Sequence, residues 1–309
     1  MKKLILACAG LAISGAAVAA PNTECKNVRF SDVGWTDITA TTALASEVLE
    51  GMGYEPTAKV LSVPVTYRSL KNKDIDVFLG NWMPTMEGDV RLYLESGDVE
   101  TVITNLEGAK YTLAVPQYVY DAGVTSFADI AKYSDKFKGR IYGIEPGNDG
   151  NRLILDMVDQ NAFGLGDFRV VESSEAGMLS QVGRATRRDE WVVFLAWEPH
   201  PMNANHDLAY LNGGDDFFGP NYGGATVHTN VRKNYLNECP NVGALLKNMT
   251  FSLAMENEVM GAILNDGEEP RNAAHTWLAN NPSVLDGWLK GVTTLNGDAA
   301  LPAVKASLK

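Results

Sequence analysis

The sequence predicts an α/β protein whose open sheets are divided between two domains. Short apolar, β-rich runs alternate with amphipathic helical runs along most of the chain, and this pattern is typical of strands joined by right-handed crossovers. The 309 residues correspond to about two domains, each large enough for its own core. With 45% hydrophobic and 21% charged residues, the composition is globular and excludes a disordered chain.

Residues 1–20 are predicted to be a secretory signal. Lys2 and Lys3 precede an apolar run over 4–13, and small residues at 17–20 offer a cleavage site. The run is too short and too rich in Ala and Gly to be retained as a membrane span, and no later window reaches the roughly 18 apolar residues that a span needs. A lipoprotein box ending at Cys8 is the weaker alternative. We therefore expect an exported, soluble mature protein.

Removal of the signal leaves two cysteines, Cys25 and Cys239. In an oxidising compartment such a pair predicts a disulfide, and the alternative is two unpaired buried thiols. A disulfide would bring both ends of the chain into one domain. The simplest organisation is then discontinuous, with residues 21–110 and 218–309 forming lobe 1 and residues 111–217 forming lobe 2. Two strand crossings would make the hinge, and the cleft between the lobes would bind the ligand.

The individual elements follow from local hydrophobic patterns. Strands are expected over 28–30, 59–63, 75–79, 99–104, 111–115, 141–144, 168–171 and 191–195. Between them we predict helices over 38–49, 152–158 and 178–185. From about residue 230 the pattern becomes almost wholly helical, over 241–249, 253–264, 270–279 and 283–289.

Three tryptophans recur just beyond predicted strands, namely Trp35, Trp82 and Trp197. Ligands of open α/β folds lie outside the carboxyl ends of strands, so this repetition favours a site, although core packing is the commoner role of a single Trp. Tyr111 opens the strand 111–115 and adds a fourth ring. Several rings around one cavity bind a quaternary ammonium, which cannot donate hydrogen bonds, at roughly 0.5–2 kcal/mol per face. The other tryptophans are assigned to packing: Trp191, Trp277 and Trp288.

Polar candidates accompany the rings. Asp37 stands at a predicted helix start, and Asn148 and Asp149 lie in a loop between a strand and a helix. Each could serve a ligand hydroxyl or offset a buried cation, or could simply be a cap or turn residue. The loop 147–150 lacks the spacing of a phosphate loop, although a helix N-terminus there could still receive a ligand carboxylate.

Composition and spacing argue against several other functions. The net charge of −12 disfavours nucleic acid and anionic membranes as main partners, because both need clustered Lys and Arg. There is no GxSxG nucleophile elbow, and we expect no catalysis, no metal and no cofactor. None of the histidines stands in a metal-ligand pattern: His200, His206, His228 and His275.

Five long stretches carry a family resemblance. They are FSDVGWTDITATTA (30–43), LSVPVTYRSLKNKDIDVFLGNWMPTM (61–86), IYGIEPGNDGNRLI (141–154), FLAWEPHPMNAN (194–205) and FGPNYGGATVHTNV (218–231). In them the chain closely resembles periplasmic choline-binding proteins of bacterial ABC importers, within the glycine betaine/choline substrate-binding family. The resemblance covers essentially the whole mature chain.

The resemblance implies a two-lobed Venus-flytrap fold with a hinge, and a periplasmic monomer that delivers choline to a membrane permease and its ATPase. It implies a four-aromatic box formed by Trp35, Trp82, Tyr111 and Trp197. It also implies that Asp37 and Asn148 contact the choline hydroxyl, that Asp149 is a neighbour, and that Cys25 and Cys239 match a family disulfide.

A betaine-binding protein is the alternative within the same family. Betaine carries a carboxylate, which Asp37 and Asp149 would repel and Arg152 could attract. The hydroxyl of choline can donate to either acid, so the sequence favours choline. Acetylcholine is a further candidate ligand, and the size of the cavity decides whether it fits.

Overall fold

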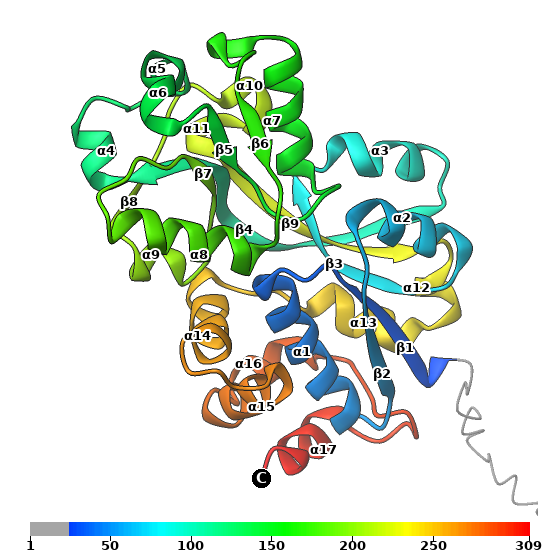
Figure 1. Cartoon of the computed structure of the whole chain (residues 1–309). Helices are drawn as coiled ribbons and strands as arrows, with labels where there is room; N and C mark the ends of the chain where they lie inside the picture. Colours follow the sequence, from blue (N-terminus) through cyan, green and yellow to red (C-terminus); the bar gives the residue numbers. More distant parts are fainter. Residues whose placement is uncertain (1–24) are drawn as a thin grey trace, which may run out of the picture.

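The structure is a computed structural model that describes residues 25–309, so the expected signal segment lies outside the described residues. Its elements gather into two lobes (Figure 1). The lower lobe in that view holds both ends of the described chain, and the upper lobe holds the middle of the sequence. Among the described residues, no helix combines the length and apolarity needed to cross a membrane.

One curled sheet continues through both lobes. Its strand order is β2-β1-β3-β9-β4-β7-β5-β6, with β8 paired to β4 outside this path. The strands are β1 (Asn27–Asp32), β2 (Glu55–Val60), β3 (Val77–Met83), β4 (Val99–Pro116), β5 (Arg140–Tyr142), β6 (Arg169–Val171), β7 (Phe194–Glu198), β8 (Leu208–Tyr210) and β9 (Gly224–Arg232). Parallel pairs β1–β2, β1–β3, β5–β6 and β5–β7 confirm the predicted α/β class.

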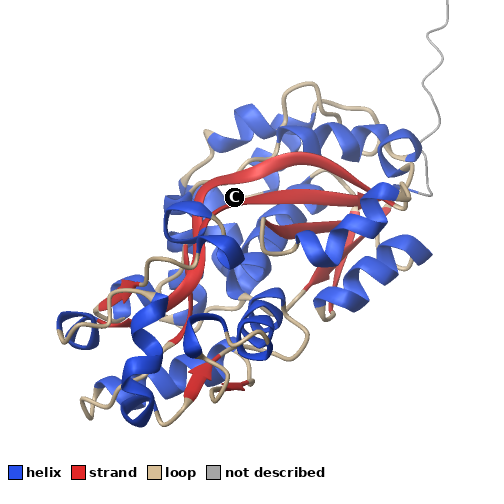
Figure 2. Ribbon diagram, turned by 90° about the horizontal axis from the view of Figure 1, so that it is seen from above, coloured by secondary structure: helices blue, strands red, loops and turns tan. Residues whose placement is uncertain are grey.

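The long strand β4 passes from the lower lobe to the upper lobe. It pairs antiparallel with β9 from Val99, opposite Arg232, to Lys110, opposite Gly224. From Lys110 onward it pairs with β7 instead. In Figure 2 the long strands bend as they leave one lobe for the other. β4 therefore changes its partner at Lys110.

Helices cover the faces of the sheet. They are α1 (Thr36–Gly51), α2 (Val63–Asn72), α3 (Glu87–Glu95), α4 (Gln117–Asp121), α5 (Phe127–Ile130), α6 (Ser134–Phe137), α7 (Asp149–Asp159), α8 (Glu175–Thr186), α9 (Met202–Asn205), α10 (Asp215–Phe218), α11 (Pro220–Gly223), α12 (Tyr235–Glu238), α13 (Pro240–Asn248), α14 (Leu253–Leu264), α15 (Pro270–Asn280), α16 (Val284–Trp288) and α17 (Ala300–Ser307). The helix α1 is buried along most of its length, because it packs on α14, α15 and α17 as well as on the strands.

Two links hold the start of the described chain in the lower lobe. The predicted disulfide is confirmed: Cys25 is bonded to Cys239 with their Cα atoms 5.6 Å apart, which joins the segment before β1 to the segment between α12 and α13. Asp76, just before β3, accepts hydrogen bonds from the guanidinium groups of Arg29 on β1 and Arg232 at the end of β9, with N–O distances of 2.7–2.8 Å.

Some boundaries differ from the sequence prediction. The expected strand 59–63 ends at Val60, because Pro64 sits at the start of a helix and Val63 opens α2. The runs 99–104 and 111–115 are one continuous strand, β4. The strand β9 is not among the strands expected from the sequence, and its polar residues Thr229 and Asn230 are buried and hydrogen-bonded to polar neighbours from adjoining strands.

Candidate functional site

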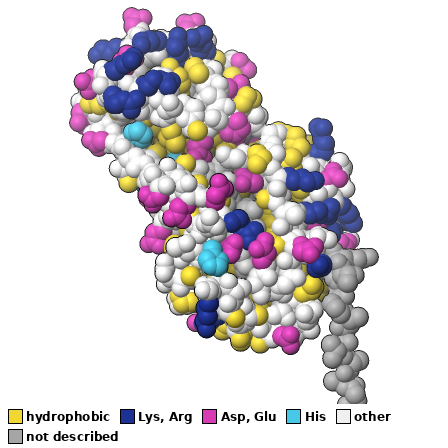
Figure 3. Space-filling model, turned by 60° about the horizontal axis from the view of Figure 1, so that its bottom comes forward, with side chains coloured by type: hydrophobic (Ala, Val, Ile, Leu, Met, Phe, Trp, Pro, Cys, Tyr) yellow, Lys and Arg dark blue, Asp and Glu magenta, His cyan; other side chains and the backbone are white. Residues whose placement is uncertain are grey.

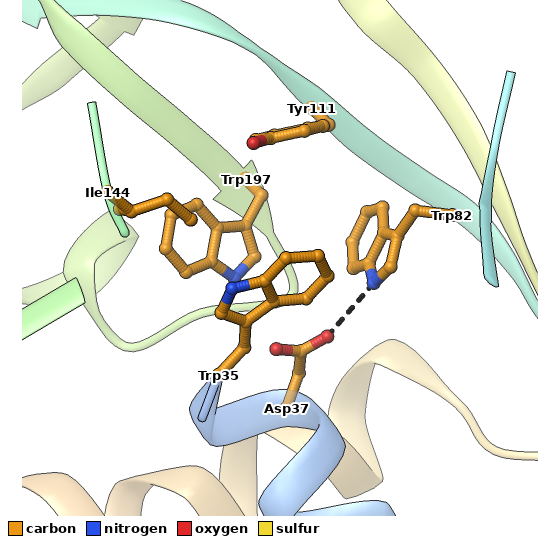
Figure 4. A pocket seen from close by; sticks show the side chains of 6 residues that line it. All are labelled: Trp35, Asp37, Trp82, Tyr111, Ile144 and Trp197. Carbon is orange, nitrogen blue, oxygen red and sulfur yellow. Dashed lines mark hydrogen bonds between the residues drawn. The ribbon is translucent and has the colours of Figure 1, made fainter. Parts of the chain in front are cut away.

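A small pocket lies where the two lobes meet. It is lined by Trp35, Asp37, Trp82, Tyr111, Ile144 and Trp197 (Figure 4). Its free volume is only about 10 Å³, so the side chains nearly fill it. That volume is about what one water molecule needs, so a larger ligand enters only if the surrounding side chains or lobes move apart. The structure thus brings together the four aromatic residues and one of the acids that the sequence predicts for a site.

Each ring is positioned by the end of a secondary-structure element. Trp35 is the N-cap residue of α1, while Trp82 and Trp197 are the next-to-last residues of β3 and β7. Tyr111 lies on β4 directly opposite Trp197 on β7. The residues therefore come from both lobes, with Trp35 and Trp82 from elements of the lower lobe and Trp197 from the upper lobe.

The rings meet edge to face rather than in stacks. The centroids of Trp82 and Tyr111 are 5.9 Å apart with their planes at 60°, and those of Tyr111 and Trp197 are 6.1 Å apart at 86°. Edge-to-face contacts suit the ring quadrupoles. In Figure 4 the rings surround a common space. Such an arrangement provides apolar walls with negative π faces and few hydrogen-bonding groups.

Two indole N–H groups at the pocket donate to carboxylates. Trp82 Nε1 donates to Asp37 Oδ2 over 3.1 Å, and Trp35 Nε1 donates to Glu145 Oε1 over 2.7 Å. The second oxygen of Asp37, Oδ1, is buried and has no hydrogen-bond partner among the described residues. An unpartnered buried acceptor is costly, so this oxygen is suited to receive a donor from a ligand.

The surroundings of the pocket are rich in acids. Burial raises the pKa of Asp37 to about 8, helped by the charge of Glu175 and opposed by the hydrogen bond from Trp82. Burial likewise raises the pKa of Glu145 to about 7, against the hydrogen bond from Trp35, and that of Asp149 to about 6, against a contact with Thr85. Acidic side chains also gather where the two lobes meet, on the face of the molecule drawn in Figure 3. A cation in the pocket would stabilise the ionised form of these acids.

Asn148 and Asp149 are buried but do not line the pocket. Asn148 caps α7, because its Oδ1 accepts the N–H of Asn151 over 2.7 Å, and its Nδ2 donates to the Tyr111 hydroxyl over 3.3 Å. Asp149 opens α7. Asn148 therefore supports the wall that carries Tyr111.

Arg152, which the sequence leaves open as a partner for a ligand carboxylate, points elsewhere. Its Nη2 donates to the backbone oxygen of Thr85 over 2.9 Å and to Asp89 Oδ2 over 2.8 Å. No Lys or Arg stands among the residues that line this pocket. Within residues 25–309 there is also no group of three or more His, Cys, Asp or Glu side chains that could hold a metal ion.

Several residues that touch the site or its walls were not predicted from the sequence. Ile144 and Glu145 follow β5 in the chain, so the same strand-end argument that selected the tryptophans could have selected them. Glu175 and His200 are also buried next to pocket residues, with His200 packed on Trp197 at a ring distance of 4.8 Å. Neither has a local sequence signal, because the contacts form only in the folded chain.

Comparisons with known proteins agree with this geometry. Residues 26–280 match the family described as the substrate binding domain of the ABC-type glycine betaine transport system. An uncharacterized protein, ORF1, of Chromohalobacter salexigens is 64% identical over 116 residues, which are 38% of this chain and 75% of that protein. The glycine betaine/carnitine transport binding protein GbuC of Listeria monocytogenes is 31% identical over 132 residues, 43% of each chain.

Solved structures give the same assignment. An ABC-transporter choline binding protein in complex with choline is 64% identical and superposes with a TM-score of 0.92 over 93% of this chain and 99% of that one. An unliganded, semi-closed structure with the same identity has a TM-score of 0.85 over 92% of this chain and 99% of that one, so the lobes lie nearer to the arrangement of the choline complex. The chain belongs to the family of substrate-binding domains of ABC-type glycine betaine transport systems.

Proposed function

We propose that this chain captures choline for an ABC uptake system. It holds the quaternary ammonium in the aromatic box formed by Trp35, Trp82, Tyr111 and Trp197. The observation that carries the proposal is the pairing of this box with one buried, unpartnered carboxylate oxygen, Asp37 Oδ1. The choline complex of a 64% identical relative supports it.

The box suits the trimethylammonium group. Each desolvated ring face contributes about 0.5–2 kcal/mol to binding of a cation, and the methyl groups bury apolar surface against the same rings. The rings lie close together, so the group that they hold must be compact. Acetylcholine is longer, and we expect it to bind more weakly because the extra atoms must displace a wall of the pocket.

The polar groups favour choline over a betaine. The hydroxyl of choline can donate to Asp37 Oδ1, whereas a ligand carboxylate would meet acids, Asp37 and nearby Glu145, in place of a cation. Arg152, the cation that the sequence offers as a partner for a ligand carboxylate, is engaged by Asp89. Asn148 acts through the Tyr111 hydroxyl in this proposal, and Asp149 adds negative charge behind the box.

Transport requires two lobes that move relative to each other, and a membrane permease that receives the ligand. We infer that residues 21–110 with 218–309 and residues 111–217 are the two lobes, and that β4 near Lys110 and the return to β9 near Gly224 form the hinge. Closure would hide the cation between the lobes, and opening on a membrane permease driven by an ATPase would release it. The predicted signal would place the mature protein, a monomer without catalytic activity, in the periplasm.

Calorimetry on the ligand-free protein tests the substrate. We expect choline to bind at least about tenfold more tightly than glycine betaine, a difference of about 1.4 kcal/mol. Glycine betaine is the second candidate, because the family description names it. Equal or reversed affinities would refute choline as the preferred ligand and leave the betaine assignment.

A further inference from the structure

Glu175 in the upper lobe reaches across to the lower lobe. It is the first residue of α8, it is only 5% exposed, and its carboxylate contacts the start of α1. Glu175 Oε2 accepts the backbone N–H of Thr36 over 2.9 Å, and Oε1 accepts the Thr36 hydroxyl over 2.5 Å. Both bonds are buried, which makes them unlike the exposed bond between Asn205 and Asn265 that also joins the two lobes.

The helix α1 has no side-chain cap of its own. Its N-cap residue is Trp35, whose side chain offers no acceptor oxygen, so the N-cap residue itself supplies no partner for the first N–H groups of the helix. By contrast, α8 is capped by Ser174, whose hydroxyl accepts the N–H of Gly177 over 3.1 Å. The carboxylate of Glu175 therefore caps α1 from the opposite lobe, where it also lies favourably at the positive end of the helix dipole.

The same carboxylate reaches the other half of the box through His200. The Nδ1 atom of His200 accepts the N–H of Met202 over 2.9 Å, so a neutral ring carries its proton on Nε2. Nε2 then donates to Glu175 Oε1 over 3.2 Å. The His200 ring packs edge to face on Trp197. One carboxylate is thus bonded to the residue that follows Trp35 and to the residue that supports Trp197.

We propose that Glu175 is a positioning residue that latches the two lobes together around the bound cation. The proposal rests on choline capture as the proposed function. When the lobes separate, the hydrogen bonds between Thr36 and the carboxylate of Glu175 break, and water must hydrate both groups. Closure restores these bonds, completes the cap of α1 and sets Trp35 and Asp37 on that helix against Trp197. The latch therefore acts on ligand release rather than on first encounter.

Stopped-flow tryptophan fluorescence with choline tests the latch through a double-mutant cycle. We expect Glu175→Gln to speed choline dissociation about ten- to a hundredfold, since its amide NH₂ would face donors, with little change in the association rate. Thr36→Val removes one donor and should have a smaller effect of the same sign. The double variant should be no worse than Glu175→Gln alone. The matched control is Glu190→Gln, an exposed acid of the same lobe paired with Lys138.

A ligand-free measurement keeps the test independent of the substrate. In the Asn205→Cys/Asn265→Cys protein, a short bismaleimide cross-links the lobes only when they are closed, so its rate reports the closed population. Glu175→Gln should slow this cross-linking severalfold, and Glu190→Gln should not. Wild-type dissociation in Glu175→Gln, additive effects with Thr36→Val, or an unchanged cross-linking rate would each overturn the latch. Failure of the wild type to bind choline would instead overturn the proposed substrate, and the cross-linking rates would still decide the latch.

Discussion

The indole N–H of Trp82 donates to Oδ2 of Asp37 over 3.1 Å, while Oδ1 of the same carboxylate stays without a partner. This bond links a wall of the box on β3 to the first turn of α1. It fixes the orientation of the carboxylate and opposes the rise in its pKa that burial causes. Trp82 therefore has two roles, one as a ring face and one as a donor, and substitutions can separate them.

Substitution of Trp82 should separate the ring from the donor. Trp82→Phe keeps a ring face but leaves Asp37 without its donor, and we expect choline to bind about tenfold more weakly. Trp82→Ala also removes the face, so the loss should reach about a hundredfold or more. Calorimetry measures both. Trp277→Phe, which loses an indole bond to Glu258 on the surface, is the control and should bind like the wild type. Wild-type affinity in Trp82→Ala would refute the box.

A single added methyl group should disturb the wall that carries Tyr111. At Gly150 on α7, a Cβ would lie 2.1 Å from the Tyr111 hydroxyl and 3.0 Å from Leu195 Cδ1, so the ring must shift. We expect Gly150→Ala to weaken choline binding by about tenfold or more and to reduce stability by about 1–3 kcal/mol. Gly261→Ala on α14 is the matched control, because nothing lies within 4 Å of its Cβ. That variant should gain up to about 1 kcal/mol and keep its affinity. Equal behaviour of the two variants would contradict this packing argument.

The aromatic box could be predicted from the sequence because its tryptophans all stand near the ends of strands. Trp35, Trp82 and Trp197 all come at or just past strand ends, and parallel strand ends meet at one edge of a sheet. The contacts of Glu175 with Thr36 and His200 have no such rule, since they join residues 139 and 25 positions apart through the fold. These contacts depend on how the two lobes pack against each other. The secondary-structure propensities of short segments carry no information about that packing.

The strand β9 illustrates a second limit. Its residues Thr229, Asn230 and Arg232 are buried although they are polar, because neighbouring strands and Asp76 supply their hydrogen-bond partners. The strand also buries Ala225, Val227 and Val231, but the polar residues between them interrupt the apolar run on which a strand prediction relies. Because β9 lies between β3 and β4 in the sheet, its polar side chains are buried as well.

The buried carboxylate of Asp76 should be a major source of stability. Burial alone would raise its pKa, but the hydrogen bonds from Arg29 and Arg232 outweigh burial and lower it. We expect Asp76→Asn to cost about 3–5 kcal/mol in the free energy of unfolding, because it leaves two guanidinium groups without their shared partner. Urea denaturation measures this cost. Glu190→Gln, which breaks an exposed ion pair, should cost no more than about 1 kcal/mol. A loss that small in Asp76→Asn would show that the bonds of Asp76 to Arg29 and Arg232 add little to the free energy of unfolding.

The stability of the ligand-free protein should fall as the pH rises from about 4 to about 8. Within this window the folded state holds protons on Asp37, Glu145 and Asp149 that the unfolded chain has already released, because burial raises their pKa values to about 8, 7 and 6. Thermal melting across this range measures the effect. Asp37→Asn should flatten the upper part of the profile, whereas an unchanged slope would place the responsible groups elsewhere.

Choline binding should depend on pH in the opposite direction. The cation favours ionised Asp37, whose pKa is about 8 in the ligand-free protein, so affinity should rise with pH and level off above that value. If only the ionised form binds, the affinity at about pH 6 should be up to a hundredfold lower than the plateau, since each pH unit below the pKa reduces the ionised fraction about tenfold. The neutral isostere 3,3-dimethyl-1-butanol has the same shape and hydroxyl without the charge, so it should gain much less from ionisation of Asp37 than choline does. Calorimetry with both ligands isolates the charge term, and parallel profiles for the two would contradict a role for the carboxylate.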